Sequence, residues 1–330
     1  MKKLNKVLKV LMVFLLVFLL TGCTKQVTVD KKNERGKKTR TVVRYNKGKN
    51  ATGQALTKNI ICKPNNKELI ELYKKYDVKV DNLKDCSKFT PKITKNDGLW
   101  DGIFVKPLAW IILKLGYLFK NFGLAVILAG LAIRLILYPV TKKSAMQSEN
   151  MKKAQPELQR LEKKYENKQN DQQAMIQKSQ EMMAIYKKYD ISFFSGCLIA
   201  IVQLPLFIAF LEAINRTPAI FEGKFLFLQL GTTPWFALSH GKFLYLIISI
   251  IVFVVTFFSL KLNGTNVTDG PNQQAAMTKS MMNVMVVVIT ISSLQLSTAI
   301  GLYWITSSLF TIVQNMLVKR SGSNAKIKSK

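Results

Sequence analysis

Histidine is almost absent from this sequence, and its scarcity excludes several classes of enzyme. The 330 residues include one histidine, His240, at the end of an apolar segment, so the apolar segments contain neither an HExxH zinc site nor a serine–histidine dyad. The G-x-x-x-x-G-K-[ST] loop of P-loop nucleotide-binding proteins is also missing. A serine–lysine hydrolase is disfavoured, because lysines near the apolar segments lie at their ends. We therefore expect no metal, no cofactor and no covalent catalysis.

Acidic residues are few, since 19 Asp and Glu stand against 49 Lys and Arg and leave a net charge of +30. Such a charge suits nucleic acid, anionic lipid and ribosomal RNA equally well. Hydrophobic residues make up 48% of the chain and are gathered in long blocks, without the periodicity of soluble helices or strands. Those blocks are typical of a membrane protein. They make DNA an unexpected partner.

The N-terminus has the pattern of a secretory signal. Four lysines precede an apolar core from Leu11 to Leu20, and Leu20-Thr21-Gly22-Cys23 then resembles the lipobox of bacterial lipoproteins. We expect residues 1–22 to be a signal peptide and Cys23 to be lipidated, which would place it in the outer leaflet. The alternative is an ordinary signal peptide or anchor helix with an incidental cysteine.

Residues 23–100 are polar and rich in lysine, and they are expected outside the cell. We predict a disordered tether over residues 24–55 and a short helix near Lys67–Tyr76, where apolar residues fall at helical spacing. Cys62 and Cys86 flank this helix on the oxidising side of the membrane. They are either a disulfide or two free thiols, and the disulfide is favoured.

The next question is which apolar segments cross the membrane. Phe122–Val140 is a clear span, and the stretch from Thr141 to Asp190 contains eleven Lys or Arg, which places it in the cytoplasm. From an external start only one span can precede that stretch. Residues 103–119, which are apolar but contain Lys106, Pro107 and Lys114, are therefore predicted to form an interfacial amphipathic helix.

The cytoplasmic stretch has two runs of residues at alternating spacings of three and four, separated by a polar break at Asn167–Asp171. This pattern predicts an antiparallel coiled-coil hairpin of two helices. The alternative is a solvated basic loop. The two runs are Met151, Ala154, Leu158, Leu161 and Tyr165, then Met175, Ser179, Met182, Tyr186 and Tyr189.

Four further spans are predicted, and they bring the basic tail back inside. Apolar Phe221–Leu238 is interrupted by Gly and Pro and is expected to lie on the outer membrane surface, whereas Leu262–Thr278 is a short inner loop. The fold class is thus an all-α membrane protein with five transmembrane helices. The spans are Phe193–Ala213, Phe243–Leu260, Ser280–Leu294 and Thr298–Val318. The expected parts are 1–22 signal peptide, 23–100 extracellular segment, 101–119 interfacial helix, 120–141 first span, 142–192 hairpin, 193–318 remaining spans with loops, and 319–330 cytoplasmic tail.

Arg134 is the one basic residue within these spans. A mid-span arginine costs ~2.5–3.5 kcal/mol on insertion scales, so such residues face a polar cavity or a partner. Gln203 in the second span and a polar stripe in the last span favour a shared, water-accessible cavity. The alternatives are snorkelling of Arg134 to the headgroups and simple hydrogen bonding between helices. The stripe consists of Thr306, Ser307, Ser308 and Gln314.

Three segments are specific in combination. They are Cys197–Phe210 (CLIAIVQLPLFIAF), Gly301–Gln314 (GLYWITSSLFTIVQ), and the Arg134 span with the following Gln155-Pro156-Glu157-Leu158. Together they resemble the YidC/Oxa/Alb family of membrane protein insertases. The resemblance covers roughly residues 100–320, and the lipobox with five spans is similar to the Gram-positive form.

The resemblance implies a helical bundle around a hydrophilic groove that is closed on the outside. Arg134, Gln203 and Trp304 would line this groove. Its substrates would be nascent membrane proteins in the bacterial cell membrane, with the ribosome, the Sec translocon and membrane lipids as partners. A channel or transporter is the alternative function, because it too needs a polar cavity, but no inverted repeat is visible. An intramembrane protease is a third reading and lacks a matched nucleophile and base.

Overall fold

The structure is a computed structural model that describes residues 25–32, 38–48, 50–93, 98–168, 171–192, 195–264 and 273–328. The expected signal peptide and Cys23 lie outside the described residues. The chain divides into two compact units. The first unit comprises Met1–Gly130, Leu204–Ser249 and Ser293–Trp304, and the second comprises Leu131–Gln203, Ile250–Ser292 and Ile305–Lys330.

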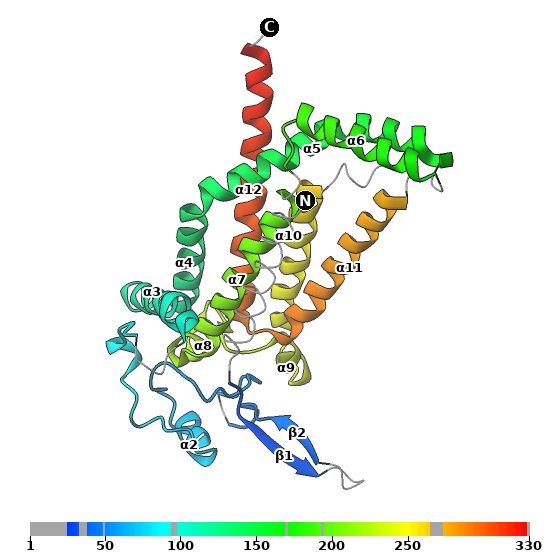
Figure 1. Cartoon of the computed structure of the whole chain (residues 1–330). Coiled ribbons are helices and arrows are strands. Elements are labelled where there is room, and N and C mark those ends of the chain that lie inside the picture. The colour runs from blue at the N-terminus through cyan, green and yellow to red at the C-terminus, as the bar shows by residue number, and fades with distance from the viewer. Residues whose placement is uncertain are drawn as a thin grey trace. The chain divides into compact units, whose positions relative to one another are not determined.

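Most elements are helices, and the strands are short (Figure 1). In chain order they are β1 (Thr28–Lys32), β2 (Lys38–Val42), α2 (Lys67–Lys75), η1 (Cys86–Lys88), η2 (Asp101–Val105), α3 (Lys106–Leu118), α4 (Phe122–Ile136), α5 (Tyr138–Tyr165), η3 (Glu166–Lys168), α6 (Gln172–Lys188), α7 (Ser195–Asn215), α8 (Pro218–Glu222), β3 (Lys224–Phe225), β4 (Leu228–Gln229), α9 (Pro234–Ser239), η4 (Phe243–Tyr245), α10 (Leu246–Gly264), α11 (Gln273–Gln295) and α12 (Thr298–Lys328).

The described residues between 25 and 93 belong to the first unit and form a small folded element, which we call the N-terminal element. β1 and β2 pair antiparallel, with Thr28 opposite Val42 and Lys32 opposite Lys38. The sequence predicted a disordered tether over residues 24–55, but the described residues of that range are folded. The apolar residues responsible are few and far apart in the sequence, so no local window looks hydrophobic. They meet in one core, formed by Val27, Val43, Tyr45, Leu56, Ile60, Leu69, Tyr73, Val78, Val80 and Phe221.

The helix predicted near Lys67–Tyr76 is confirmed as α2. Asn66 caps its first turn by accepting a hydrogen bond from the backbone N–H of Glu68, and Lys74 and Lys75 complement the helix dipole at its end. Cys62 and Cys86 are joined in a disulfide, so this helix lies within a covalently closed loop.

The N-terminal element folds onto the loop that follows α7. The Glu222 carboxylate, at the end of α8, accepts hydrogen bonds from the backbone N–H groups of Asn65 and Asn66, both at 3.1 Å. Burial raises the pKa of Glu222, and these two donors oppose the rise. Phe221 inserts into the core of the element. This loop was expected to lie on the membrane surface, and it forms α8, β3, β4 and α9 in sequence.

Arg216 ties three segments of the first unit together. Its guanidinium pairs with both carboxylate oxygens of Asp101, at 2.6 and 3.1 Å, and with Glu212 at 3.2 Å. Its Nε donates to the carbonyl oxygen of Asn59 at 2.8 Å. Because Arg216 is buried, these partners offset the cost of removing its charge from water.

The helix predicted over residues 101–119 is present as η2 and α3. Leu108, Ala109, Ile112 and Leu113 are buried, while a second set of apolar side chains is exposed. That second set is Ile103, Phe104, Tyr117, Leu118 and Phe119. Two apolar faces suit a helix at a membrane interface, and its placement there stays a prediction.

In the second unit, the chain bends by 70° between α4 and α5. The segment Phe122–Val140, which the sequence predicts as one span, is therefore bent after Ile136. Pro139 in the first turn of α5 explains the break, because proline has no N–H to continue the hydrogen-bond ladder and its ring excludes the carbonyl of the preceding turn.

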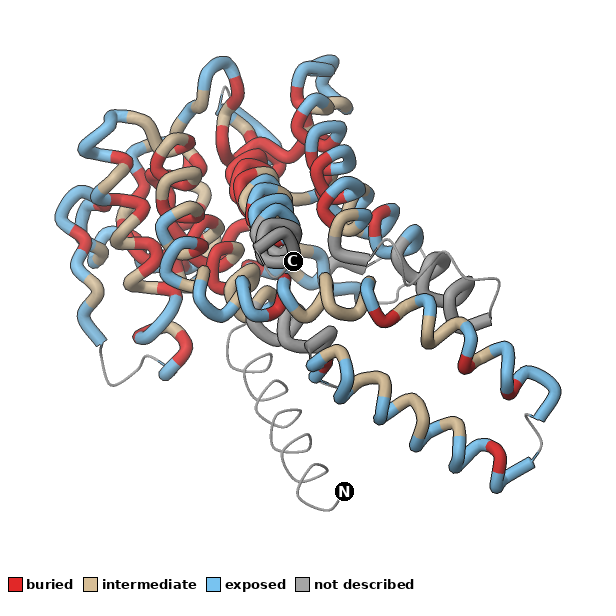
Figure 2. Tube along the Cα trace, turned by 90° about the horizontal axis from the view of Figure 1, so that it is seen from above, coloured by how far each residue is buried: buried red, intermediate tan, exposed pale blue. Residues whose placement is uncertain are grey.

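α5 and α6 pack side by side and form the charged hairpin expected between Thr141 and Asp190 (Figure 1). Leu161, Tyr165 and Ala174 are buried between them, with Met182 and Ile185 packed alongside. The rest of the hairpin is mostly exposed or half-buried (Figure 2). Regular coiled-coil packing along its length stays a prediction.

Among the described residues, Phe243–Leu262 is the one helix that is both long and apolar enough to cross a membrane unaided. The bent pair Phe122–Ile136 and Tyr138–Lys168 passes the same test only when taken together, and Gln203–Asn215 and Asn283–Gln295 are shorter apolar helices. Helices α7, α10, α11 and α12 overlap the four later segments expected to span. The five-span topology therefore stays a proposal.

A buried arginine held by three helices

Arg134 lies in the last turn of α4, closer to the end of its helix than the sequence indicated. It is 7% exposed, although the next two residues, Leu135 and Ile136, are exposed apolar side chains. The guanidinium thus turns away from the apolar surface and into the second unit. Arginine stays charged in proteins, so a full positive charge is buried here.

The guanidinium is held by neutral side-chain oxygens from two other helices. Nη2 donates to Oε1 of Gln203 on α7 at 2.6 Å, and Nε donates to Oγ of Ser307 on α12 at 2.9 Å. Nη2 also contacts the same Ser307 hydroxyl. Hydrogen bonds to a charged group are stronger than those between neutral groups, which lowers the cost of burying Arg134. They also fix the direction in which the guanidinium points.

Ser307 belongs to a polar face that continues along α12. Thr311 and Gln314 follow at helical spacing, and the buried Gln314 donates to Oγ1 of Thr141, at the start of α5, at 3.0 Å. Arg134 and Thr141 flank the bend between α4 and α5. The polar face of α12 therefore contacts the chain on both sides of that bend.

The structure brings together two of the three expected groove residues. Arg134 and Gln203 are hydrogen-bonded, whereas Trp304 belongs to the first unit, where its ring meets Phe207 edge-on with centroids 5.1 Å apart. Ser307 was noted in the sequence only as part of a polar stripe. Its role as an arginine partner could not be assigned, because Thr306, Ser307 and Ser308 are equivalent in sequence and differ only in which way the helix turns them.

The described residues give little support for a metal site or for a catalytic serine–histidine pair. No group of three or more His, Cys, Asp or Glu side chains could hold a metal ion there. His240 is exposed at the end of α9, and its Nδ1 lies 3.1 Å from the Ser239 hydroxyl and 2.9 Å from the carbonyl oxygen of Phe236. The Ser239 hydroxyl itself donates to Phe236, so this pair closes a helix end.

One family model and several curated proteins match most of this chain. The family model described as "60Kd inner membrane protein" matches residues 114–326. A protein of Oceanobacillus iheyensis named "Membrane protein insertase YidC" is 33% identical over 243 residues, which cover 72% of this chain and 91% of that protein. "Membrane protein insertase MisCA" of Bacillus subtilis is 34% identical over 239 residues, 72% of this chain and 86% of that protein. "Membrane protein insertase YidC 2" of Bacillus anthracis is 34% identical over 236 residues, 71% and 87% of the two chains.

Proposed function

This chain belongs to the family of the 60Kd inner membrane protein, the YidC/Oxa/Alb insertases, and we propose that the arginine between α4, α7 and α12 is what its insertion activity depends on. The relatives are named membrane protein insertases. The chain accordingly inserts and folds nascent membrane proteins in the bacterial cell membrane, and it is not an enzyme.

The observation that carries the proposal is the pair of hydrogen bonds that the buried guanidinium donates to the uncharged side chains of Gln203 and Ser307. These partners orient the positive charge without cancelling it. A charge in a low-dielectric setting acts strongly on a nearby carboxylate and repels lysine and arginine. The protein therefore favours substrates whose polar segment is short and acidic.

The energy for insertion comes from the substrate. Burying its hydrophobic segment in lipid yields ~25 cal/mol per Å² of apolar surface. The contribution of this protein is kinetic, because a hydrated groove part-way across the membrane shortens the apolar distance that a polar tail must cross. Five spans with Arg134, Gln203 and Trp304 on the groove walls form the proposed arrangement.

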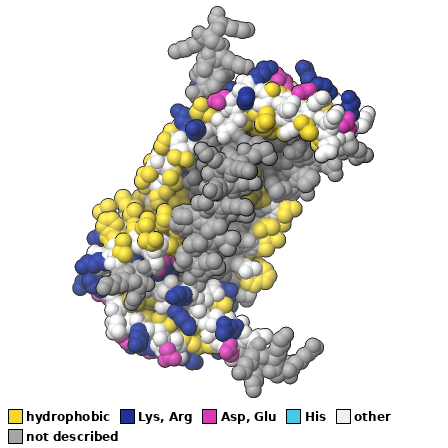
Figure 3. All heavy atoms as spheres, in the orientation of Figure 1, with side chains coloured by type: hydrophobic (Ala, Val, Ile, Leu, Met, Phe, Trp, Pro, Cys, Tyr) yellow, Lys and Arg dark blue, Asp and Glu magenta, His cyan; other side chains and the backbone are white. Residues whose placement is uncertain are grey.

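The topology is part of the same proposal. Cys23 bears a lipid on the outer face, and the hairpin and the tail from Lys319 face the cytoplasm, where they meet ribosomes, the Sec translocon and anionic lipid. The dense basic and acidic side chains over α5 and α6 support the aqueous placement of the hairpin (Figure 3). Intact-mass measurement tests the anchor, because a mature chain that retains Met1 without an acyl group rules it out.

Substitution of Arg134 tests the proposal. In cells depleted of the native protein, Arg134→Ala is expected to impair insertion of single-span substrates with acidic outer tails, while Arg134→Lys keeps much of the activity because it keeps the charge. Protease accessibility of the outer tail measures insertion.

The control is Arg160→Ala, which removes an exposed arginine of the hairpin and should insert normally. Full insertion by an abundant, folded Arg134→Ala protein would mean that the arginine has no part in the activity.

A further inference from the structure

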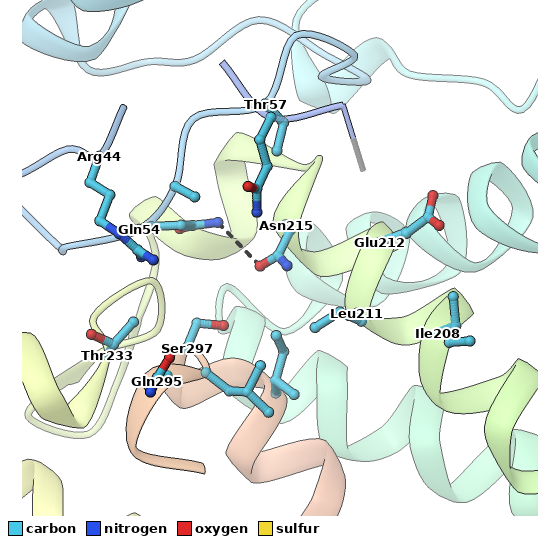
Figure 4. A pocket seen from close by; sticks show the side chains of 14 residues that line it. Arg44, Gln54, Thr57, Ile208, Leu211, Glu212, Asn215, Thr233, Gln295 and Ser297 are labelled. Atoms are coloured by element: carbon cyan, nitrogen blue, oxygen red, sulfur yellow. Dashed lines mark hydrogen bonds between the residues drawn. The ribbon is translucent and has the colours of Figure 1, made fainter. Parts of the chain in front are cut away.

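The first unit contains a cavity of about 420 Å³ with both apolar and polar lining residues, which the groove proposal does not use. Its walls come from the N-terminal element, the end of α7 and the start of α12, and we call it the carboxamide cavity because Gln26, Gln54, Asn215 and Gln295 line it (Figure 4). Its size falls within the roughly 300–1,000 Å³ of ordinary ligand sites. It is far larger than the ~30 Å³ that one water molecule occupies in the liquid.

Two walls of this cavity differ in chemistry. One is apolar, with Ile208 and Leu211 from α7 and Ile300 from α12. The other presents carboxamides, of which Gln54 donates through Nε2 to Oδ1 of Asn215 at 3.4 Å. Carboxamides both donate and accept hydrogen bonds, as backbone peptide groups do. This combination suits a short stretch of polypeptide, whose backbone needs polar partners and whose side chains need apolar contact.

Two polar atoms of residues that line the cavity have no hydrogen-bond partner among the described residues. Ser297 is 4% exposed and Gln54 is 8% exposed, yet the Ser297 hydroxyl and Oε1 of Gln54 have no hydrogen-bond partner among the described residues. Both atoms have almost no accessible surface, so the wall of the cavity is not fully hydrogen-bonded within itself. Buried polar groups without a partner are unfavourable, which indicates that the side chains of this wall can rearrange when the cavity is filled.

The charge at the cavity points to the kind of segment that it takes. Arg44 lines the cavity and is exposed, whereas the carboxylate of Glu212 is already paired with Arg216 at 3.2 Å. Glu212 is buried, so the exposed charge at the cavity is that of Arg44 and is positive. An acidic or neutral polar segment is preferred over a basic one.

We propose that the carboxamide cavity receives the polar outer tail of a substrate as it emerges from the membrane. This inference rests on the proposed function and topology, in which the end of α7 and the start of α12 lie on the outer side. The tail would be held here in extended form while its hydrophobic segment moves into lipid.

Photocrosslinking tests the contact. The photoreactive residue p-benzoylphenylalanine is placed at Gln295, which is exposed and lines the cavity, or at Thr41, which is exposed on β2 and does not line it. During insertion of a single-span protein with a short acidic outer tail, the adduct to that tail should be several-fold stronger from position 295 than from position 41. Adducts to lipid alone, or equal adducts from both positions, would overturn the proposal.

Filling the cavity tests its use. Ala55→Phe places a large side chain at the cavity wall and should slow translocation of the acidic tail, with Thr41→Phe as the matched control. Insertion of a substrate without an outer tail should be unchanged.

Two readouts separate the possible failures. An intact Cys62–Cys86 disulfide in Ala55→Phe shows that the N-terminal element has folded. If the wild-type chain inserts neither substrate, the proposed function fails. If it inserts both and Ala55→Phe is as fast as wild type, the cavity proposal alone fails.

Discussion

Arg134 shows how a charge can be kept inside an apolar bundle. Its partners at Gln203 and Ser307 are oxygens without charge, so the guanidinium is oriented but not neutralised by them. A carboxylate partner would stabilise the arginine more and leave it less able to attract a substrate. These two contacts orient the guanidinium and do not remove its charge, as the proposed function requires.

Removing the Ser307 hydroxyl should therefore affect both stability and activity. Ser307→Ala takes away a partner of Arg134 and is expected to destabilise the second unit by ~1–3 kcal/mol, because a hydrogen bond to a buried charge is lost. Ser307→Thr keeps the hydroxyl and should restore most of the loss. Thermal unfolding in detergent and the insertion rate are the two measurements.

The neighbouring Ser308→Ala is the control, since one residue along a helix points about 100° away. Equal losses from Ser307→Ala and Ser308→Ala would indicate general disturbance of α12 and not a specific support of Arg134.

At the scale of elements, the α5–α6 hairpin is held by two matched clusters. Lys164 and the Tyr165 hydroxyl both reach Oε1 of Glu181, at 2.6 and 2.9 Å, and Lys188 and the Tyr189 hydroxyl reach Oε1 of Glu157, at 2.5 and 2.9 Å. A Lys-Tyr pair on each helix thus contacts a glutamate on the other. The hydrogen bonds from Lys164 and Lys188 lower the pKa of Glu181 and of Glu157.

The sign of these shifts predicts how the hairpin responds to pH. A lowered carboxyl pKa means that the stabilisation is complete above the unfolded pKa of ~4.3 and is lost as the pH falls through the folded value. The lysine pKa values are raised, so their share is lost only as the pH rises above the unfolded lysine value of ~10.4. The opening equilibrium of the hairpin, obtained by dividing its hydrogen-exchange rate by the intrinsic rate at each pH, should be constant near neutrality and increase in acid.

The double variant Glu157→Gln and Glu181→Gln provides the comparison. It should exchange faster at neutral pH and lose most of the acid dependence. A wild-type hairpin that opens no faster in acid would contradict the proposed role of these clusters.

The C-terminal tail is a second basic element of the chain. Lys319, Arg320, Lys326, Lys328 and Lys330 follow the last apolar turns of α12. Deleting residues 319–330 should weaken co-sedimentation with ribosomes at low salt, because several phosphate contacts would be lost. A scrambled tail of the same composition should bind as the wild type does, and binding that survives the deletion would place the contact elsewhere.

At the scale of the whole molecule, the two units depend on different forces. The N-terminal element in the first unit has a small core and is closed by the Cys62–Cys86 disulfide, with 24 residues of sequence separation. The second unit has no disulfide among its described residues and consists of helices. Reduction should therefore lower the stability of the first unit more than that of the second.

Replacing both cysteines by serine is expected to destabilise the N-terminal element by about 3–4 kcal/mol in the chain-entropy account of disulfides. Limited proteolysis should then cut within residues 25–93 while the α5–α6 hairpin retains its wild-type resistance. Equal cleavage of both regions would show that the disulfide supports the whole chain.

The sequence by itself determined the features that depend on local composition. Long apolar blocks, the lysine-rich stretch after Val140 and the spacing of Leu161 and Tyr165 predict helices, membrane association and a hairpin, because each is set by neighbouring residues. The family followed from short motifs around Gln203 and Trp304. Helix α2 was also visible, since its apolar residues recur within nine positions.

The tertiary structure alone decided which distant residues meet. Val27, Val43 and Leu56 are joined by backbone hydrogen bonds of 2.8 to 2.9 Å, yet they lie far apart in the sequence. Ser307 became a partner of Arg134 only through the rotation of α12, across 173 positions of sequence. Contacts between residues so far apart form only when the whole chain has folded, and local sequence patterns do not predict them.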